Sequence, residues 1–219
     1  MEILFDNCRP LITSEEIQDR VRELAGRISD DYRGKDPLLI VLLKGGFIFL
    51  ADLVRNLTIP CEVEFVTASS YRDGARRSME VEIDVNIKSD ITGREIIVVE
   101  GIVDTGHTLA NLMRKLSEQG VQSCRVCTLL DKPSARQVEA DVYYVGFEIP
   151  DVFAVGYGLD FMKQYRNLPY IAELLPASPD ATIARQLVKH PDFVSTAVEP
   201  VDEPSAIPSD GEMAEKQHR

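Results

Sequence analysis

The chain has 219 residues, 44% of them hydrophobic and 27% charged, a composition typical of one globular domain with a possible appendage. Its 24 Lys and Arg against 36 Asp and Glu give a net charge of −12, which excludes a general electrostatic attraction to nucleic acid or to an anionic membrane. No apolar run approaches the roughly 20 residues that span a bilayer, and the acidic start of the chain does not resemble a secretory signal.

The predicted elements alternate between helix and strand from the N-terminus to about residue 175. Thr13 and Glu16 have the spacing of a helix capping box, and the apolar face of the first helix follows at Ile17, Val21, Leu24 and Ile28. We then expect strands at 38–43, 62–70, 96–99, 124–130, 142–149 and 153–155, and further helices at 47–57 and 109–119, the last capped by Gly120. Apolar strands separated by amphipathic helices predict an α/β fold with a doubly wound, mainly parallel sheet.

Cys124 and Cys127 have CxxC spacing, but they lie within a predicted strand. Positions i and i+3 of a strand point to opposite faces, so we expect separate structural thiols rather than a redox or metal pair. Four cysteines without a secretion signal indicate reduced thiols and a cytoplasmic protein.

Two segments fall outside the alternating pattern. Residues 71–79 form a polar, basic, glycine-containing loop, which is typical of an active-site lid, with a solvated hairpin tip as the alternative. Residues 176–219 carry six prolines and eight acids against four bases, so we expect a mostly disordered tail, either dispensable or partner-binding. The predicted organisation is one domain over 1–175 and a tail over 176–219.

Residues 96–109 combine a buried strand, acidic residues and a glycine-containing turn. Glu100 ends the apolar run, and Asp104, Gly106 and two threonines precede a helix that we expect to begin near Thr108. In an open α/β sheet, ligands bind beyond the carboxyl ends of the strands, where a helix N-terminus presents unpaired N–H groups to an anion. The segment therefore predicts a phosphate cradle, with a plain helix-capping turn as the alternative.

The same residues nearly fit the G-x4-G-K-[ST] loop of P-loop NTPases. However, His107 stands where that loop needs a lysine, and Asp104 lies inside a loop that should close on a polyanion. Both differences oppose binding of a nucleoside triphosphate.

The segment instead resembles the 5-phosphoribosyl pyrophosphate (PRPP) motif of the type I phosphoribosyltransferases, in which acidic residues after a buried strand are followed by Asp-[Thr/Ser]-Gly-x-Thr. Over about 5–175 the chain resembles the hypoxanthine-guanine phosphoribosyltransferases, with five separated motifs in the family's order. Besides the PRPP motif they are a pyrophosphate loop at 42–46, the start of a lid at 68–71, a purine-reading lysine at 129–133, and a base-stacking and metal segment at 147–160 that is followed by 165–169.

This resemblance implies the type I phosphoribosyltransferase fold, with a small hood and a mobile lid loop over the sheet. It implies purine salvage: Mg²⁺-dependent transfer of the phosphoribosyl group from PRPP to hypoxanthine, and to guanine, giving IMP or GMP and pyrophosphate. The partners implied are these small molecules, with no nucleic acid and no membrane, and a homodimer or homotetramer is a family expectation.

The resemblance also assigns the site residues. Asp104 would be the general base that accepts a purine proton, and the peptide before or at Lys44 would be cis. The 5′-phosphate and ribose would be bound by Glu100, Gly101, Asp104, Thr105, Gly106, His107 and Thr108. The pyrophosphate group would be bound by Lys44, Gly45 and Arg166, and the purine by Lys132, Phe153, Ala154 and Asp160. Mg²⁺ would be bound by Asp160 and Glu100, and the lid would contain Ser70 and Tyr71.

Simpler interpretations exist for several of these residues. Asp104 is also a good helix N-cap, Lys44 a typical solvated residue at a strand end, Lys132 part of an ordinary turn, and Phe153 a typical core residue.

One position departs from the family pattern. Gly101 follows Glu100 where the family has a second acidic residue, so one acceptor for a ribose hydroxyl is missing. Loss of a charged hydrogen bond of about 1.5–3 kcal/mol predicts PRPP binding weaker by about one to two decades, and an aspartate at 101 would be expected to lower the KM for PRPP.

Two rival functions follow from the same residues. A non-catalytic PRPP-sensing regulator would tolerate Gly101, but it would not need the purine-reading residues Lys132 and Phe153. An orotate or uracil transferase would lack that pair of residues in this arrangement.

Overall fold

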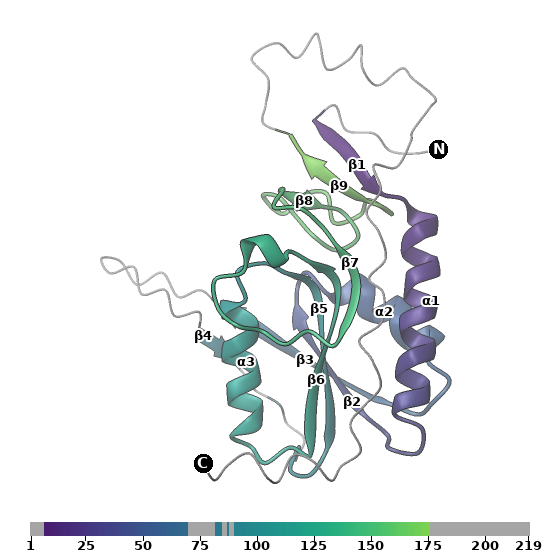
Figure 1. The fold of residues 1–219 in the computed structure, drawn as a ribbon, viewed down its shortest axis with the longest axis vertical. Helices are drawn as coiled ribbons and strands as arrows, with labels where there is room; N and C mark the ends of the chain where they lie inside the picture. The colour runs from purple at the N-terminus through teal and green to yellow at the C-terminus, as the bar shows by residue number, and fades with distance from the viewer. Residues whose placement is uncertain (1–6, 70–81, 85–86, 88–89, 176–219) are drawn as a thin grey trace, which may run out of the picture.

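The computed structural model describes residues 7–69, 82–84, 87 and 90–175. These residues form two sheets and three α-helices (Figure 1). In chain order the elements are β1 (Cys8–Ile12), α1 (Ser14–Asp31), β2 (Leu38–Leu43), α2 (Phe47–Asn56), β3 (Glu62–Ser69), β4 (Glu82–Asp84), β5 (Glu95–Val103), α3 (His107–Ser117), β6 (Ser123–Asp131), the 3₁₀ helix η1 (Pro133–Ala135), β7 (Tyr144–Glu148), β8 (Ala154–Val155) and β9 (Ile171–Leu174).

The larger sheet has the strand order β4-β3-β2-β5-β6-β7. The pairs β3–β2, β2–β5, β5–β6 and β6–β7 are parallel, and the short β4 adds an antiparallel edge. The chain leaves β2 toward one side and β5 toward the other, so the order reverses between these strands. This confirms the predicted doubly wound, mainly parallel sheet.

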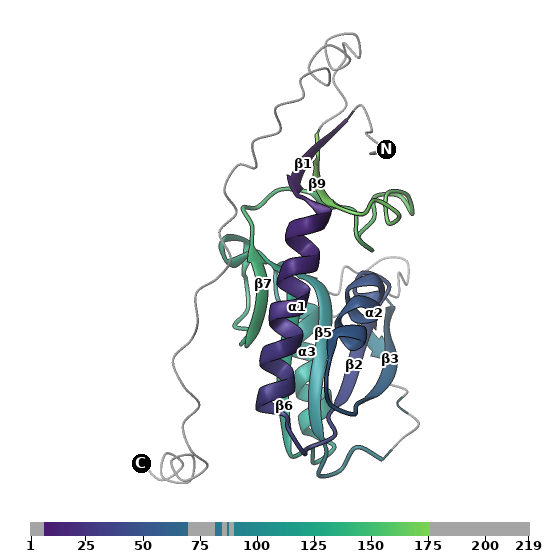
Figure 2. The ribbon, with the colours of Figure 1, turned by 90° about the vertical axis from the view of Figure 1, so that its right-hand side faces the viewer.

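Helices cover both faces of this sheet, with α1 and α2 on one face and α3 on the other (Figures 1 and 2). The alternation of side chains along β2 supplies both cores. Leu39 and Val41 pack in the cluster that contains the buried residues of α1 and α2, whereas Leu38 and Ile40 pack with those of α3. A strand buried on both faces needs the continuous apolar run that the sequence shows.

The first helix forms as predicted. The Thr13 hydroxyl accepts the Glu16 N–H at 3.2 Å, and the Glu16 carboxylate accepts the Thr13 N–H at 2.7 Å, which completes the capping box. The four predicted core positions of the helix, Ile17, Val21, Leu24 and Ile28, are fully buried.

The prediction that Cys124 and Cys127 point to opposite faces of their strand is confirmed. Cys124 packs against the α3 core and Cys127 lies in the α1 and α2 core, on opposite faces of β6. All four cysteines of the chain are free thiols.

A smaller antiparallel sheet, β1-β9-β8, forms the hood beyond one end of the main sheet (Figure 1). The strand predicted at 153–155 belongs to this hood and not to the main sheet. β1 and β9 were not predicted as strands, because each is short and is stabilised by pairing across the sequence, as in the register Arg9↔Glu173. The side chains of Arg9 and Glu173 also form an ion pair.

The boundaries of two elements near the predicted phosphate cradle differ from expectation. β5 continues to Val103, so Glu100 and Gly101 lie within the strand and not after it. α3 begins at His107, with Gly106 as its N-cap, and its C-cap is Glu118, not Gly120.

Several predictions lie outside the described residues. They are the lid with Ser70 and Tyr71, the loop at 71–79 and the tail over 176–219. In the part of the chain that the structure does describe, no helix is long and apolar enough to cross a membrane.

Candidate active site

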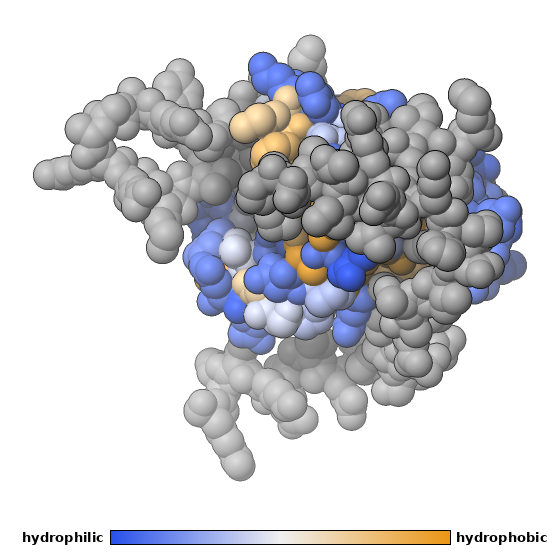
Figure 3. Space-filling model, turned by 90° about the horizontal axis from the view of Figure 1, so that it is seen from above, coloured by the Kyte–Doolittle hydropathy of each residue, from blue (hydrophilic) through white to orange (hydrophobic). Residues whose placement is uncertain are grey.

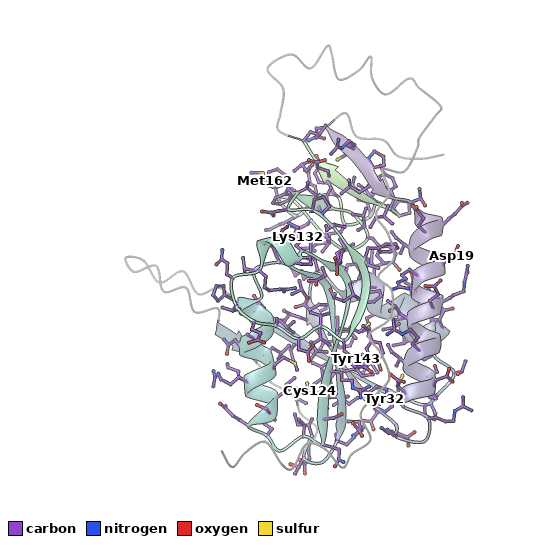
Figure 4. The ribbon with its side chains drawn as sticks, viewed as in Figure 1. Asp19, Tyr32, Cys124, Lys132, Tyr143 and Met162 are labelled. Atoms are coloured by element: carbon purple, nitrogen blue, oxygen red, sulfur yellow. The ribbon has the colours of Figure 1, made fainter. Side chains whose placement is uncertain are left out.

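The carboxyl ends of the parallel strands bring three predicted site residues to one edge of the sheet. Lys44 follows β2, Asp104 follows β5 and Lys132 follows β6. The N–H of Lys132 donates to the carbonyl of Val103 at 3.0 Å, which extends the ladder between β5 and β6 to the last residue of the strand. Figure 4 shows Lys132 at the end of the sheet below the hood, far from Tyr32 and Cys124 at the opposite end.

The loop between β5 and α3, where the sequence predicts a phosphate cradle, turns tightly at Gly106. Gly106 has a φ of 88°, and a Cβ there would lie only 2.9 Å from the carbonyl oxygen of Val138, so this turn requires glycine. The carbonyl of Thr105 accepts N–H groups from Gln137 at 3.0 Å and from Val138 at 3.2 Å. The loop is therefore supported by the chain that follows η1.

No side chain caps the N-terminus of α3. Asp104 is therefore not the helix cap that the simpler interpretation expected, and its carboxylate remains available for another role. The first intrahelical hydrogen bond runs from Ala110 to Gly106, which leaves the preceding amides, including those of His107 and Thr108, pointing out of the helix end. The His107 ring contacts the Gln137 side chain at 3.2 Å, and the His107 backbone N–H is one of the amides at this helix end.

Lys132 lies between two carboxylates. Its ammonium nitrogen is 3.5 Å from Oδ2 of Asp104 and 3.5 Å from Oδ1 of Asp151. The lysine side chain is only 6% exposed, whereas those of Asp104 and Asp151 are 50% and 66% exposed. A buried cation thus holds two carboxylates that remain open to a ligand. Asp151 is a functional candidate that only the folded chain reveals; its position after Pro150 in the predicted purine segment was the available signal in the sequence.

Glu100 is buried within β5. Burial raises the pKa of its carboxyl to about 8, although the neighbouring Gly101 N–H acts in the opposite direction. Near pH 7 the carboxyl is therefore mainly protonated and can donate a hydrogen bond as well as accept one.

The predicted base-stacking residue is exposed. Phe153 is 52% exposed and meets Phe161 edge to face, with ring centroids 5.4 Å apart. It is therefore not the core residue of the simpler interpretation, and about half of the residue is accessible to a ligand. Ala154 follows as the first residue of β8. Figure 3 shows this end of the molecule, where hydrophobic surface appears between hydrophilic residues.

Asp160 and Arg166 form an ion pair with a distance of 2.6 Å between Nη2 and Oδ1. The other Asp160 oxygen accepts the N–H of Lys163 at 2.8 Å, and Arg166 also donates to the carbonyl of Gly158. The residue assigned to the metal and the residue assigned to pyrophosphate are thus direct partners.

The Lys44 loop packs closely on β5. The Leu43–Lys44 peptide is cis, as expected, and the Lys44 side chain is exposed. A Cβ on Gly101 would lie 2.7 Å from the carbonyl oxygen of Gly45, nearer than real Cβ atoms approach backbone. A side chain at 101 would therefore meet the Lys44 loop itself, which argues on steric grounds against the gain expected from an aspartate there.

A buried polar contact that sequence reasoning missed links the hood segment, the residues that follow β8, to α2. The Tyr157 hydroxyl donates to the Asp52 carboxylate, which is itself buried. Burial acts to raise the pKa of this carboxyl, but donated hydrogen bonds hold that pKa below its ordinary value, those from Tyr157, Gln18 and Arg55. No local pattern could have paired residues this far apart in the chain.

The chain is similar to known phosphoribosyltransferases in sequence and in structure. Residues 13–162 match the family model of the phosphoribosyl transferase domain. The chain is 47% identical over 172 residues to a hypoxanthine-guanine phosphoribosyltransferase of Mycobacterium avium, covering 76% of this chain and 85% of that protein. It is 43% identical over 167 residues to the hypoxanthine phosphoribosyltransferase of Escherichia coli, covering 75% and 94%.

A solved structure supports the same grouping. The hypoxanthine phosphoribosyltransferase of Trypanosoma cruzi in complex with the product IMP superposes with a TM-score of 0.73 at 38% identity, covering 80% of this chain and 98% of that one.

Proposed function

Because this chain belongs to the phosphoribosyltransferase family, we propose that it transfers the phosphoribosyl group of PRPP to hypoxanthine, and to guanine, releasing pyrophosphate. The chain is an enzyme of purine salvage, like the relatives that it matches. The observation that carries the proposal is the approach of Lys132 to Asp104, 3.5 Å apart at the ends of adjacent strands. In this proposal the lysine is the donor to the 6-oxo group and the neighbouring aspartate is the acceptor of a ring proton.

The cradle at 104–108 is proposed to bind the 5′-phosphate of PRPP. The outward-pointing amides at the start of α3 and the hydroxyls of Thr105 and Thr108 supply donors, and the helix dipole favours an anion there. Lys44, Gly45 and Arg166 are proposed to bind the pyrophosphate group. The Arg166 guanidinium can pair with phosphate oxygens when it exchanges Asp160 or the Gly158 carbonyl for them.

The purine is proposed to lie against the exposed face of Phe153, with its 6-oxo group accepting a hydrogen bond from Lys132. As purine N9 bonds to C1 of the ribose, the bond from C1 to pyrophosphate breaks and the leaving group takes its electron pair. The base must then lose a proton, and Asp104 accepts it from N7. General-base catalysis of this kind contributes typically ~10²–10⁴-fold.

Magnesium is proposed as the cofactor, and the residues present fit it. In the described ranges no three or more His, Cys, Asp or Glu side chains converge on one point. The partly exposed Asp160, whose oxygens already accept from Arg166 and from the Lys163 N–H, can supply one carboxylate ligand. Mg²⁺ usually binds to one or two carboxylates and completes its shell with water and substrate phosphates. When bound, it neutralises charge on the pyrophosphate. Glu100 would have to release its proton to act as a second ligand.

A PRPP sensor without catalysis is not favoured, because the relatives are enzymes and a sensor has no need of the Lys132–Asp104 pair. We further propose a cytoplasmic location, supported by the four free thiols.

We propose a homodimer or homotetramer, supported by the exposed Phe47 and Phe65 of α2 and β3, and measurable by analytical ultracentrifugation.

The test is a panel of bases assayed with PRPP and Mg²⁺: hypoxanthine, guanine, xanthine, adenine and uracil. We expect IMP from hypoxanthine and GMP from guanine, with adenine and uracil inactive. Binding of PRPP without product from any 6-oxopurine would reject the proposed reaction in favour of the sensor.

A further inference from the structure

Three backbone segments meet at the carbonyl oxygen of Gly45. A Cβ added to Gly101 would lie 2.7 Å from that oxygen, and a Cβ added to Gly158 would lie 2.5 Å from it. Both distances are shorter than real Cβ atoms show to other atoms. The Gly45 carbonyl therefore packs directly against Gly101 of β5 and Gly158 after β8, and this arrangement is named the Gly45 contact.

The neighbouring contacts leave this loop little room to move aside. A Cβ on Gly101 would also lie 3.2 Å from the Leu159 side chain, and a Cβ on Gly45 would lie 3.3 Å from it. The next residue of the loop, Gly46, is packed as closely, since a Cβ there would lie 2.9 Å from Val41 and 3.3 Å from the Gly101 nitrogen. The obstacles to a side chain at 101 include backbone, which yields far less readily than the end of a flexible side chain.

We propose that Gly101 is a positioning residue for the pyrophosphate loop. The missing side chain lets the Gly45 carbonyl lie directly against β5, and this contact sets where Lys44 and the Gly45 N–H meet the pyrophosphate of PRPP. The inference rests on the proposed function. In it, the absence of a side chain at Gly101 favours binding of the pyrophosphate group, whereas the loss of a ribose acceptor would only weaken binding of PRPP.

The two accounts of Gly101 predict different results for two substitutions. If position 101 matters through a missing acceptor, Gly101→Asp lowers the KM for PRPP and Gly101→Ala changes little. If position 101 matters through the Gly45 contact, both substitutions displace the loop. Both then raise the KM for PRPP in the forward reaction and the KM for pyrophosphate in the reverse reaction.

The experiment compares Gly101→Ala and Gly101→Asp with the matched control Gly26→Ala, since Gly26 in α1 has open space around its Cβ position. We expect both 101 variants to raise the KM for PRPP and for pyrophosphate at least about tenfold, equivalent to 1.4 kcal/mol. The KM for hypoxanthine should change by less than about twofold on the same scale. Gly26→Ala should match the parent chain.

Direct titration calorimetry of Mg²⁺ and pyrophosphate into each variant separates this inference from the proposed reaction, because it needs no turnover. Circular dichroism checks that each variant is folded. If the 101 variants do not fold, Gly46→Ala tests the same packing, because its Cβ would lie 3.3 Å from the Gly101 nitrogen and the backbone φ of −86° accepts a side chain; it should weaken pyrophosphate binding in the same way. Gly101→Asp with a lower KM than the parent, or Gly101→Ala indistinguishable from Gly26→Ala, would overturn the inference.

Discussion

Lys132 and Asp104 lie 3.5 Å apart, Nζ to Oδ2, although 28 residues separate them in the chain. They meet because β5 and β6 are adjacent parallel strands in the register Val103↔Asp131, so the residue after each strand reaches the same edge. The lysine is buried and the aspartate is half exposed. The burial fixes the cation in position and leaves the carboxylate open to a ligand.

Removing the Asp104 carboxylate should suppress turnover while PRPP still binds. We expect Asp104→Ala to lower kcat by about 10²–10⁴-fold, because the purine proton loses its acceptor. The measurement is steady-state kinetics with hypoxanthine beside calorimetric titration of PRPP.

Asp151→Asn is the matched control for Asp104→Ala, since it removes the charge of the other carboxylate at 3.5 Å from the same lysine. It should alter the KM for hypoxanthine more than kcat. An equal fall in kcat for both variants would mean that Asp104 acts only by holding Lys132.

Replacing Lys132 should weaken discrimination between 6-oxopurines and adenine. Lys132→Met keeps the length of the side chain but loses a charged donor worth about 1.5–3 kcal/mol, so kcat/KM for hypoxanthine should fall about 10- to 100-fold. Lys35→Met is the control, because Lys35 is exposed and pairs with Glu95 at the opposite end of β5. A preference for hypoxanthine over adenine that survives Lys132→Met would contradict the assigned role.

The buried Glu100 carboxyl should make stability depend on pH. Its folded pKa of about 8 lies above the ordinary 4.5, so between these values the folded chain binds more protons than the unfolded chain. The contribution of Glu100 to stability is therefore present below pH 4.5 and is lost as the pH rises toward 8. The free energy of unfolding should fall by up to about 1.4 kcal/mol per pH unit in this window.

Glu100→Gln tests this by removing the titrating group. Urea unfolding between pH 5 and 8, run in parallel on the parent, should give a flatter pH dependence for the variant. Glu118→Gln, on an exposed ion pair of α3, is the control and should follow the parent. Parallel curves for Glu100→Gln and the parent would rule out the raised pKa.

The contact between Tyr157 and Asp52 should stabilise the attachment of the hood segment to α2. Tyr157→Phe leaves a buried carboxylate without one of its donors, so we expect about 1–3 kcal/mol lower stability in denaturant unfolding. A double-mutant cycle with Asp52→Asn should show that the two effects do not add. Additive losses would mean that this contact contributes nothing of its own.

Local patterns in the sequence were sufficient for the three α-helices and for the parallel strands of the main sheet, but not for its antiparallel edge strand β4. The apolar run at 38–43 required a strand buried on both faces, and the Thr13–Glu16 spacing required a capped helix, because both depend on residues near in the chain. The motif at 104–108 likewise placed a glycine turn before a helix. The fold class, the family and the cradle followed from these local signals.

Contacts between distant segments were decided only by the tertiary structure. The hood strands β1 and β9 pair across most of the chain, and the environment of Gly101 depends on Gly45 and Gly158 from two other segments. The sequence showed that a carboxylate is missing at 101, but not that backbone occupies its space. Packing between segments has no period or spacing in the sequence, so steric room at a position becomes visible only when the chain is folded.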